Sequence, residues 1–495
     1  MEKSIVSKIP ALANRVHCKR CNGPVAGSYP LTVLTRRILS SIVYPDEIAP
    51  YINNRYIRRT GHRIMNIRDI SQAAKKAAIQ LAAVSSEQKN GALRAIADEL
   101  YRNASEIIAA NKKDIEAGKL NNLSTPLLKR LRFDQGKIDE VTEGISSLVS
   151  LPDPVGTTLS ATELDKGLEL YKVSCPIGVI GVIFESRPDA LVQISTLCLK
   201  SGNGVLLKGG SEARNTNRVL ADTINRATAS AGIPRGWLQL LETRADVGEM
   251  LAVDEYIDLI IPRGSNEFVK YIMDNSNIPV LGHADGICHV YVDADADLDR
   301  AVAIAVDSKT QYVAVCNAAE TLLVHEAVAD RFLPCIQETF QQKNVELRGC
   351  EKTALIISVS PAGPQDWKTE YLDYILSVKV VADIDEAIHH INTYGSGHTD
   401  SIVTENREAA IRFMDLVDSG NVFWNCSTRF SDGFRYGLGA EVGISTNKIH
   451  ARGPVGLEGL LIYKWKLIGS GNTVAGYAAE KSFTHKKLDK KFEEI

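Results

Sequence analysis

The sequence predicts an α/β fold built on two parallel sheets, each covered by helices on both faces. Between residues 168 and 241 short apolar segments alternate with helical ones, and a second alternating block runs from Ile287 to about Ile449. Alternation of this kind is typical of a parallel sheet whose two faces are buried. The chain has 495 residues. That is too long for one compact core, so we expect about three structural units.

Helical patterns come first along the chain, and strands begin after Pro152. Ser85 stands where a capping residue would start the second helix, ahead of apolar residues at helical spacing. The expected helices are 73–83, the one after Ser85, 104–117, 133–148, 188–200 and 212–231. The expected strands are 168–173, 178–184, 205–208 and 237–241.

The composition excludes several classes of protein. Hydrophobic residues make up 44% of the chain and charged residues 24%, which is ordinary for a globular protein. A formal net charge of −3 gives no basic field to attract nucleic acid. We find no apolar run long enough to span a bilayer and no secretory signal. We therefore expect a cytoplasmic protein with no nucleic-acid or membrane partner.

The nine cysteines are scattered, and an odd number without framework spacing indicates reduced thiols. Cys18 and Cys21 form a Cys-x-x-Cys pair, but a structural zinc would need two more ligands, and no second pair follows. We predict no metal site.

Residues 1–64 differ sharply in charge from the rest of the chain. They hold eleven Lys and Arg against three Asp and Glu, a charge of +8, which leaves −11 for the remainder. Two interpretations fit this basic leader: a targeting peptide, or a non-native leader with translation starting at Met65. We favour the second, because Asp46, Glu47 and the polar stretch 51–56 suit a transit peptide poorly. In either case we expect no packed domain there.

Two strand-to-helix turns could hold phosphates. Lys208 ends a predicted strand and is followed by Gly209, Gly210 and Ser211; the second turn is Arg263-Gly264-Ser265. Glycines let a ligand approach the backbone, and a helix start offers free N–H groups to an anion. The Gly-x-Gly-x-x-Gly fingerprint is absent. Two ordinary tight turns remain the alternative.

Cys316 is the candidate nucleophile. It is followed by Asn317 and then by a strand-like segment at 321–325. A loop thiol with nearby N–H groups could serve as nucleophile and oxyanion donor. The alternative is a small buried apolar residue, as most unpaired cysteines are.

Two late segments are rich in hydrogen-bond donors, 425–429 and 445–454. Such loops suit a small anionic substrate, although surface turns are an equal alternative. The candidate substrate-binding residues are Asn425, Ser427, Arg429, Ser445 and Arg452.

Taken together, these segments resemble the γ-glutamyl phosphate reductase family, within the aldehyde dehydrogenase superfamily, over nearly all of Met65–Ile495. The resemblance rests on six ordered blocks: 181–188 (GVIFESRP), 207–210 (LKGG), 262–266 (PRGSN), 281–288 (LGHADGIC), 316–317 (CN) and 441–446 (EVGIST) with its continuation to 454.

The resemblance implies two Rossmann-like α/β domains plus a small β oligomerisation unit. The cofactor domain would comprise residues 65–153 and 173–292, and the catalytic domain residues 293–450. Residues 154–172 and 451–495 would form the oligomerisation unit, so a homo-oligomer is expected.

The resemblance also assigns roles to residues. Cys316 would be the nucleophile with Asn317 beside it, and Arg187 would stand where related enzymes have an oxyanion-hole Asn. Lys208, Gly209, Ser211, Gly264 and Ser265 would hold the adenosine ribose and phosphates of NADPH, and Glu370 the nicotinamide ribose. An arginine at 187 suits a substrate that carries phosphate.

The implied reaction is the NADPH-dependent reduction of L-glutamate 5-phosphate to L-glutamate 5-semialdehyde through a cysteine thioester, in proline biosynthesis, with a separate glutamate 5-kinase supplying the substrate. Oxidising relatives carry a water-activating Glu where this chain has Val280, which favours reduction here. Two rivals remain: a hydrolytic aldehyde dehydrogenase for a small acidic aldehyde, disfavoured by Val280, and a catalytically dead relative, disfavoured by the intact Cys316, Lys208 and Glu370.

Overall fold

The computed structural model describes residues 66–242, 245–283, 285–477 and 482–494. All elements described below belong to the unit Met65–Ile495. The basic leader, with Cys18 and Cys21, lies outside the described residues, and so do our interpretations of it.

The first sheet is four-stranded, parallel, and ordered β5-β4-β3-β6. Alternate residues of its central strand face opposite sides: Ile180 and Val182 join one apolar cluster, and Val179 and Ile183 join the other. Period-two alternation with both faces apolar is what a fully covered strand requires. The strands are β3 (Val179–Phe184), β4 (Gly204–Gly209), β5 (Leu238–Leu241) and β6 (Leu259–Arg263).

The register aligns the carboxyl ends of three of these strands, because Phe184 pairs with both Gly209 and Arg263. The turns that begin at Glu185, Gly210 and Gly264 therefore open on one edge of the sheet. Ligands bind at this edge in open parallel sheets.

Nine helices of the described ranges surround this sheet or connect its strands. Their starts follow local chemistry: Asn66, Ser85 and Asp134 cap three of them, each accepting a backbone N–H three residues on. The helices are α2 (Ile67–Leu81), α3 (Ser86–Arg102), α4 (Ala104–Leu120), α5 (Thr125–Leu131), α6 (Gln135–Ser150), α7 (Pro188–Lys200), α8 (Arg214–Ser230), α9 (Ala245–Leu251) and α10 (Asn266–Asn275).

Three helix starts differ from the sequence prediction. α6 begins at Gln135, two residues after the predicted start, because Asp134 caps it. α2 begins at Ile67, six residues before the predicted start, because Asn66 caps it. The helix predicted from residue 212 is first a 3-10 turn, Ser211–Ala213, and α8 begins at Arg214.

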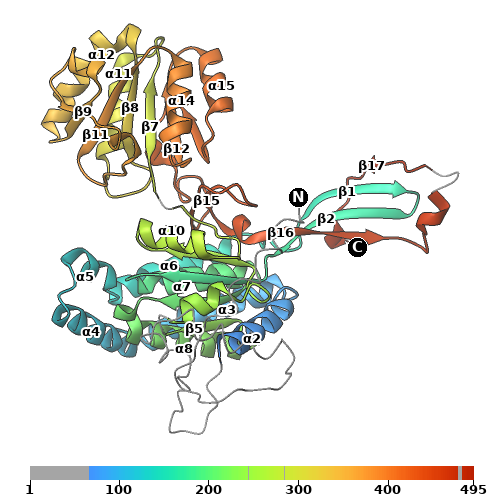
Figure 1. The fold of residues 1–495 in the computed structure, drawn as a ribbon. Coiled ribbons are helices and arrows are strands. Elements are labelled where there is room, and N and C mark those ends of the chain that lie inside the picture. The colour runs from blue at the N-terminus through green and yellow to red at the C-terminus, as the bar shows by residue number, and fades with distance from the viewer. Residues whose placement is uncertain (1–65, 243–244, 284, 478–481, 495) are drawn as a thin grey trace, which may run out of the picture. The chain divides into compact units, whose positions relative to one another are not determined.

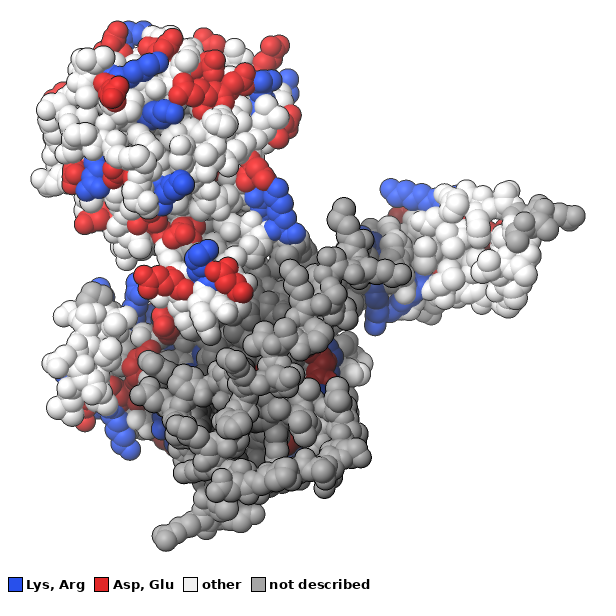
Figure 2. Space-filling model, in the orientation of Figure 1, with Lys and Arg blue, Asp and Glu red and all other residues white. Residues whose placement is uncertain are grey.

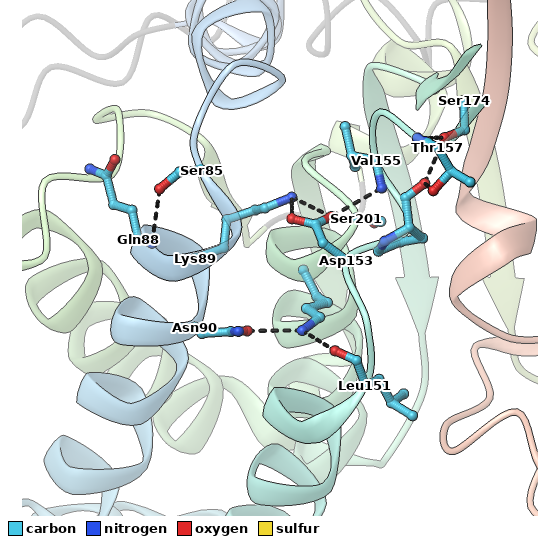
Figure 3. A network of polar contacts seen from close by, with 12 residues as sticks. Ser85, Gln88, Lys89, Asn90, Leu151, Asp153, Val155, Thr157, Ser174 and Ser201 are labelled. Carbon is cyan, nitrogen blue, oxygen red and sulfur yellow. Dashed lines mark hydrogen bonds and ion pairs between the residues drawn. The ribbon is translucent and has the colours of Figure 1, made fainter. Parts of the chain in front are cut away.

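A buried ion pair fixes the point where the chain leaves the helices for the first strand pair (Figure 3). Lys89 on α3 is 1% exposed and its Nζ lies 2.6 Å from Asp153. Asp153 also accepts the N–H of Val155. Lys200, at the end of α7, donates to Asn90 and to the carbonyl of Leu151 beside this pair. The segment before β1 is thus held by two buried ammonium groups.

The second sheet has seven parallel strands in the order β10-β9-β11-β8-β7-β12-β13. Figure 1 shows α11 and α12 beside one face and α14 and α15 beside the other, and each face has its own apolar cluster. The strands are β7 (Cys288–Val292), β8 (Ala319–His325), β9 (Glu346–Gly349), β10 (Ser360–Pro361), β11 (Ile375–Val381), β12 (Thr399–Val403) and β13 (Asn421–Trp424). The helices are α11 (Leu298–Thr310), α12 (Glu326–Gln342), α13 (Glu351–Ala354), α14 (Ile384–Tyr394) and α15 (Arg407–Leu416).

The strand β7 pairs with β8 and β12, so it belongs to this second sheet. The predicted cofactor domain ran to residue 292 and included it. The pairing moves this boundary ahead of Cys288, because an apolar run does not reveal which sheet a strand will join.

A third, antiparallel sheet has the order β16-β2-β1-β17, with strands β1 (Thr158–Asp165), β2 (Leu168–Pro176), β16 (Leu461–Ile468) and β17 (Lys486–Lys487). It joins the two segments predicted to form the oligomerisation unit, although β2 runs four residues past the predicted limit of 172. Trp465 and Leu467 of β16 are each 56% exposed. Figure 2 shows a largely uncharged surface over this sheet.

A short hairpin of β14 (Gly443–Ser445) and β15 (Gly453–Val455) completes the strands. The described helices include none that is long and apolar enough to cross a membrane.

Candidate active site

Cys316 lies in the loop between α11 and β8. This loop packs against the segment that contains Gly286. A Cβ added at Gly286 would lie 2.1 Å from the carbonyl oxygen of Cys316 and 2.4 Å from its Cα, so only glycine permits this approach. The thiol of Cys288 donates to the same carbonyl at 3.2 Å. The block 281–288 and the cysteine loop are therefore one packed structure.

Two histidines adjoin the sulfur. His398 lies just before β12, is fully buried, and places Nε2 3.2 Å from the Sγ of Cys316. Its Nδ1 lies 2.8 Å from the hydroxyl of Thr399. His283 packs edge-on to His398 with ring centroids 5.0 Å apart, and its Nδ1 lies 2.9 Å from the carbonyl oxygen of Ile444.

Burial keeps these three groups uncharged near neutral pH. It raises the pKa of the Cys316 thiol to about 12, with smaller contributions from Glu370 and Glu441, while Arg263 acts against them. Burial also lowers the pKa of His398 well below its usual value and lowers that of His283. A neutral imidazole within hydrogen-bond distance of a neutral thiol can accept its proton as the sulfur attacks.

Arginines gather around the thiol. Arg263 donates to the carbonyl of Val442, and its pKa is lowered by burial and by the neighbouring Arg187, an effect that Glu441 and Cys316 oppose. Arg429 is 8% exposed. Burial lowers its pKa, and the neighbouring Cys316 opposes that shift. Clustered guanidinium groups suit phosphate and carboxylate ligands.

Glu370 brings a carboxylate to the same place. It accepts from the amide of Asn266, in the turn after β6, and from the backbone N–H of Gly286. Burial raises its pKa. The predicted Gly264 and Ser265 lie in that same turn, where a Cβ at 264 would come within 2.8 Å of Glu185. The structure therefore brings Glu370, Gly264 and Ser265 together beside the thiol loop.

Gly209 and Ser211, two of the other predicted cofactor residues, line a small pocket at the ends of β4 and β5. Gly210, Arg214 and Glu242 also line it. Lys208 is buried and donates to the carbonyl of Gly209. Arg214 makes one hydrogen bond to Glu242, at 2.9 Å, and its side chain is 52% exposed.

Several predicted site residues mainly hold their own loops. Asn317 donates its amide to the carbonyl of Ser431, and Asn425 donates to and accepts from the backbone of Thr404. Ser427 caps the short turn Thr428–Phe430, and Arg452 clamps Asp418 and the carbonyl of Thr446. These side chains make hydrogen bonds within the protein, although Oδ1 of Asn317 is buried without a partner among the described residues.

The hydroxyl of Ser445 is also fully buried without a partner among the described residues. Arg187 pairs with Asp189 at 3.0 Å while its side chain stays 45% exposed. Arg187 therefore keeps hydrogen-bonding capacity for a ligand.

Sequence reasoning missed the two histidines, Arg263 as a cation of the site, and Glu441. His283 lies in the block 281–288 and Glu441 in the block 441–446, both of which resemble the family, so the sequence did point to each of them. His398 stood in none of them, and only the fold reveals it.

Val280 is 8% exposed and belongs to the apolar cluster that includes Ile183 and Ile260. Its carbonyl accepts from the amide of Asn447. The position thus carries a buried apolar side chain and no carboxylate.

Comparison with known proteins identifies close relatives. The aldehyde dehydrogenase family model matches residues 46–360 and 353–439. A γ-glutamyl phosphate reductase of Acetivibrio thermocellus is 67% identical over 429 residues, which cover 86% of this chain and 100% of the relative. One of Methanococcoides burtonii is 55% identical over 435 residues, covering 85% and 97%.

Solved structures agree. The crystal structure of a γ-glutamyl phosphate reductase from Thermotoga maritima shares 41% identity and a TM-score of 0.81, over 83% of this chain and 100% of that one. An engineered glycolyl-CoA reductase with bound NADP⁺ shares 16% identity and a TM-score of 0.55, over 81% of this chain and 96% of that one. The second match supports the fold alone, and the predicted fold class is confirmed.

Proposed function

Because the chain belongs to the γ-glutamyl phosphate reductases of the aldehyde dehydrogenase family, we propose that it reduces L-glutamate 5-phosphate to L-glutamate 5-semialdehyde, releasing phosphate, as a step toward proline. The observation that carries this proposal is the thiol of Cys316 with its proton acceptor His398 3.2 Å away, beside several arginines.

The sulfur of Cys316 attacks the acyl carbon and forms a thioester. The thiol proton passes to Nε2 of His398, and phosphate leaves with the electron pair of the broken C–O bond. Arg263 and Arg187 are placed to balance the charge on phosphate, which a neutral donor at position 187 would do less well. We assign Arg429 and the buried, unpartnered hydroxyl of Ser445 to the amino-acid end of the substrate.

The residues beside the thiol fit a nicotinamide cofactor, the kind that aldehyde dehydrogenases use. Glu370 offers a carboxylate to ribose hydroxyls, and Gly264 and Ser265 lie in the neighbouring turn after β6. When bound, the reduced cofactor supplies hydride to the thioester carbon. Collapse of the resulting thiohemiacetal then returns the thiol and releases the aldehyde.

We assign the reductant as NADPH. Arg214 lines the pocket together with Gly209, Gly210 and Ser211, and it donates one hydrogen bond to Glu242. Its exposed guanidinium is available to a phosphate on the adenosine ribose. A 2′-phosphate would give it a second anionic partner.

Three further assignments follow from the same proposal. The acyl phosphate is unstable in water, so a separate glutamate 5-kinase supplies it. The exposed apolar side chains of β16 support a homo-oligomer built through the third sheet. The need for a free thiol at Cys316 suits the reducing cytoplasm.

The test is the reverse reaction: reduction of NADP⁺ with glutamate 5-semialdehyde in the presence of phosphate. The expected rate depends on phosphate, and Cys316→Ser abolishes it while leaving the fold and NADP⁺ binding unchanged, because a hydroxyl is a much poorer nucleophile. The exposed Cys335 provides the matched control, and Cys335→Ser keeps full activity. A phosphate-independent rate would instead indicate a hydrolytic dehydrogenase.

A further inference from the structure

We propose that His283, Cys316 and His398 form a three-ligand site for Zn²⁺, and that a zinc ion bound there reversibly holds the enzyme inactive. The site uses the thiol that turnover needs. The metal-bound and the catalytic states therefore exclude each other.

The geometry meets the requirements of zinc. One ring nitrogen of each histidine and the sulfur of Cys316 all lie within 4.8 Å of one another. Tetrahedral zinc with Zn–N and Zn–S bonds of normal length needs ligand atoms about 3.3–3.6 Å apart. The His398 nitrogen is already 3.2 Å from the sulfur. The other two separations, which both involve His283, stay within 4.8 Å.

The ring nitrogens facing away from the sulfur are held as they are in zinc proteins. Metal-ligating histidines almost always donate their second N–H to a carbonyl, carboxylate or water, which fixes the ring and its tautomer. The carbonyl of Ile444 can only accept, so Nδ1 of His283 carries the proton and Nε2 keeps its lone pair. Nδ1 of His398 is engaged by the hydroxyl of Thr399, which leaves Nε2 for the metal.

Charges of both signs surround the site, so a bound cation is held weakly enough to exchange. Glu370 and Glu441 both interact with the sulfur of Cys316 and favour a positive ion there. Arg263 and Arg429 oppose it. On binding, Zn²⁺ replaces the thiol proton, which is released to the buffer. Three protein ligands leave the fourth position of the metal to water.

The test measures metal binding without substrate or cofactor, so it stands apart from the proposed reaction. The protein is the full-length chain carrying Cys18→Ser and Cys21→Ser, since that Cys-x-x-Cys pair could itself take zinc. Equilibrium dialysis with Zn²⁺ alone should give one ion per chain. Co²⁺ should give a thiolate-to-cobalt charge-transfer band that Cys316→Ser removes.

The decisive variants change one histidine each. His283→Asn and His398→Asn should each weaken Zn²⁺ affinity on the order of 100-fold or more. Zn²⁺ should slow iodoacetamide labelling of Cys316 in the parent, and much less in His283→Asn. Cys335→Ser is the control and should leave binding unchanged. Thermal unfolding checks that each variant is folded, and His283→Asn carries the test if the fully buried His398 does not tolerate change.

Equal affinity in the parent and His283→Asn would mean that Zn²⁺ binds the thiol alone, and the proposed site would be wrong. A charge-transfer band that survives Cys316→Ser would place the metal elsewhere and would equally overturn it.

Discussion

We propose that a single side chain, Val280, is one reason why this enzyme reduces. Its neighbours Ile183 and Ile260 are apolar, and it offers water no base. The thioester on Cys316 should therefore be slow to hydrolyse, which leaves time for hydride transfer. Glu370 and Glu441 are carboxylates near the sulfur, but each is already engaged by backbone N–H groups.

Val280→Glu should divert part of the thioester to free glutamate. A well-placed general base contributes roughly 10²–10⁴-fold to such a step. Burial among apolar residues keeps part of the new carboxyl protonated, so we expect partial diversion. The measurement is the ratio of glutamate to semialdehyde formed under limiting NADPH.

The matched control is Val280→Gln, which has nearly the same shape and no base. Both variants must unfold at similar temperatures for the ratio to be compared. If folded Val280→Glu gives the same ratio as Val280→Gln, exclusion of water or Arg187 protects the thioester, and our explanation of Val280 fails.

Single residues also mark the limit of sequence reasoning. The glycine turns at 209 and 264 could be predicted, because a turn and its strand are local in sequence. His398 could not, since it lies 82 residues from Cys316 and becomes its neighbour only through the pairing of β7 with β8 and β12. Asn425 and Arg452 were predicted to face substrate, but a donor's partner depends on tertiary contacts such as those with Thr404 and Asp418.

At the scale of elements, the start of α8 shapes the pocket that we assign to the cofactor. The 3-10 turn Ser211–Ala213 delays the helix, so Arg214 is its first residue and lines the pocket. Arg218, one turn later, makes two hydrogen bonds to Glu242, at 2.8 and 2.7 Å.

Arg214→Ala should raise the KM for NADPH by about 10–100-fold, the equivalent of one charge-assisted hydrogen bond. The KM for NADH should change little, because NADH lacks the 2′-phosphate. Steady-state kinetics with both cofactors measure the difference. Arg218→Ala is the control, and an equal loss for both cofactors in Arg214→Ala would show that the arginine only supports the pocket wall.

Elements are more predictable where their ends carry their own signals. The helix Pro188–Lys200 matches its prediction at both ends, because proline favours the first helical position and the chain turns at Ser201-Gly202. The link between α6 and β1 was not predictable, since it depends on Lys89, 64 residues from Asp153.

Asp153→Ala should lower the free energy of unfolding by about 3–5 kcal/mol, because it strips Lys89 of its partner in a buried place. Urea unfolding measures the loss. The double variant Asp153→Ala with Lys89→Met should recover most of it, since no buried charge remains unpaired. If the single variant is as stable as the parent, Lys200 and Asn90 hold the segment without the ion pair.

For the whole molecule, the open question is where the folded enzyme begins. The Acetivibrio relative is covered completely by 86% of this chain. The family model, however, already matches from residue 46. The leader also differs from the rest in charge, +8 against −11, and has no periodic apolar face to dock.

Two truncations separate these possibilities. A chain starting at Met65 should fold and keep the activity of the full chain, because helix α2 has its own cap in Asn66 and its buried residues pack within the unit Met65–Ile495. A chain starting at Asp46 serves as the comparison. Soluble yield, thermal unfolding and the reverse reaction are measured for both. If only the longer chain is folded and active, residues 46–64 are part of the enzyme, and our interpretation of the whole leader as dispensable is wrong.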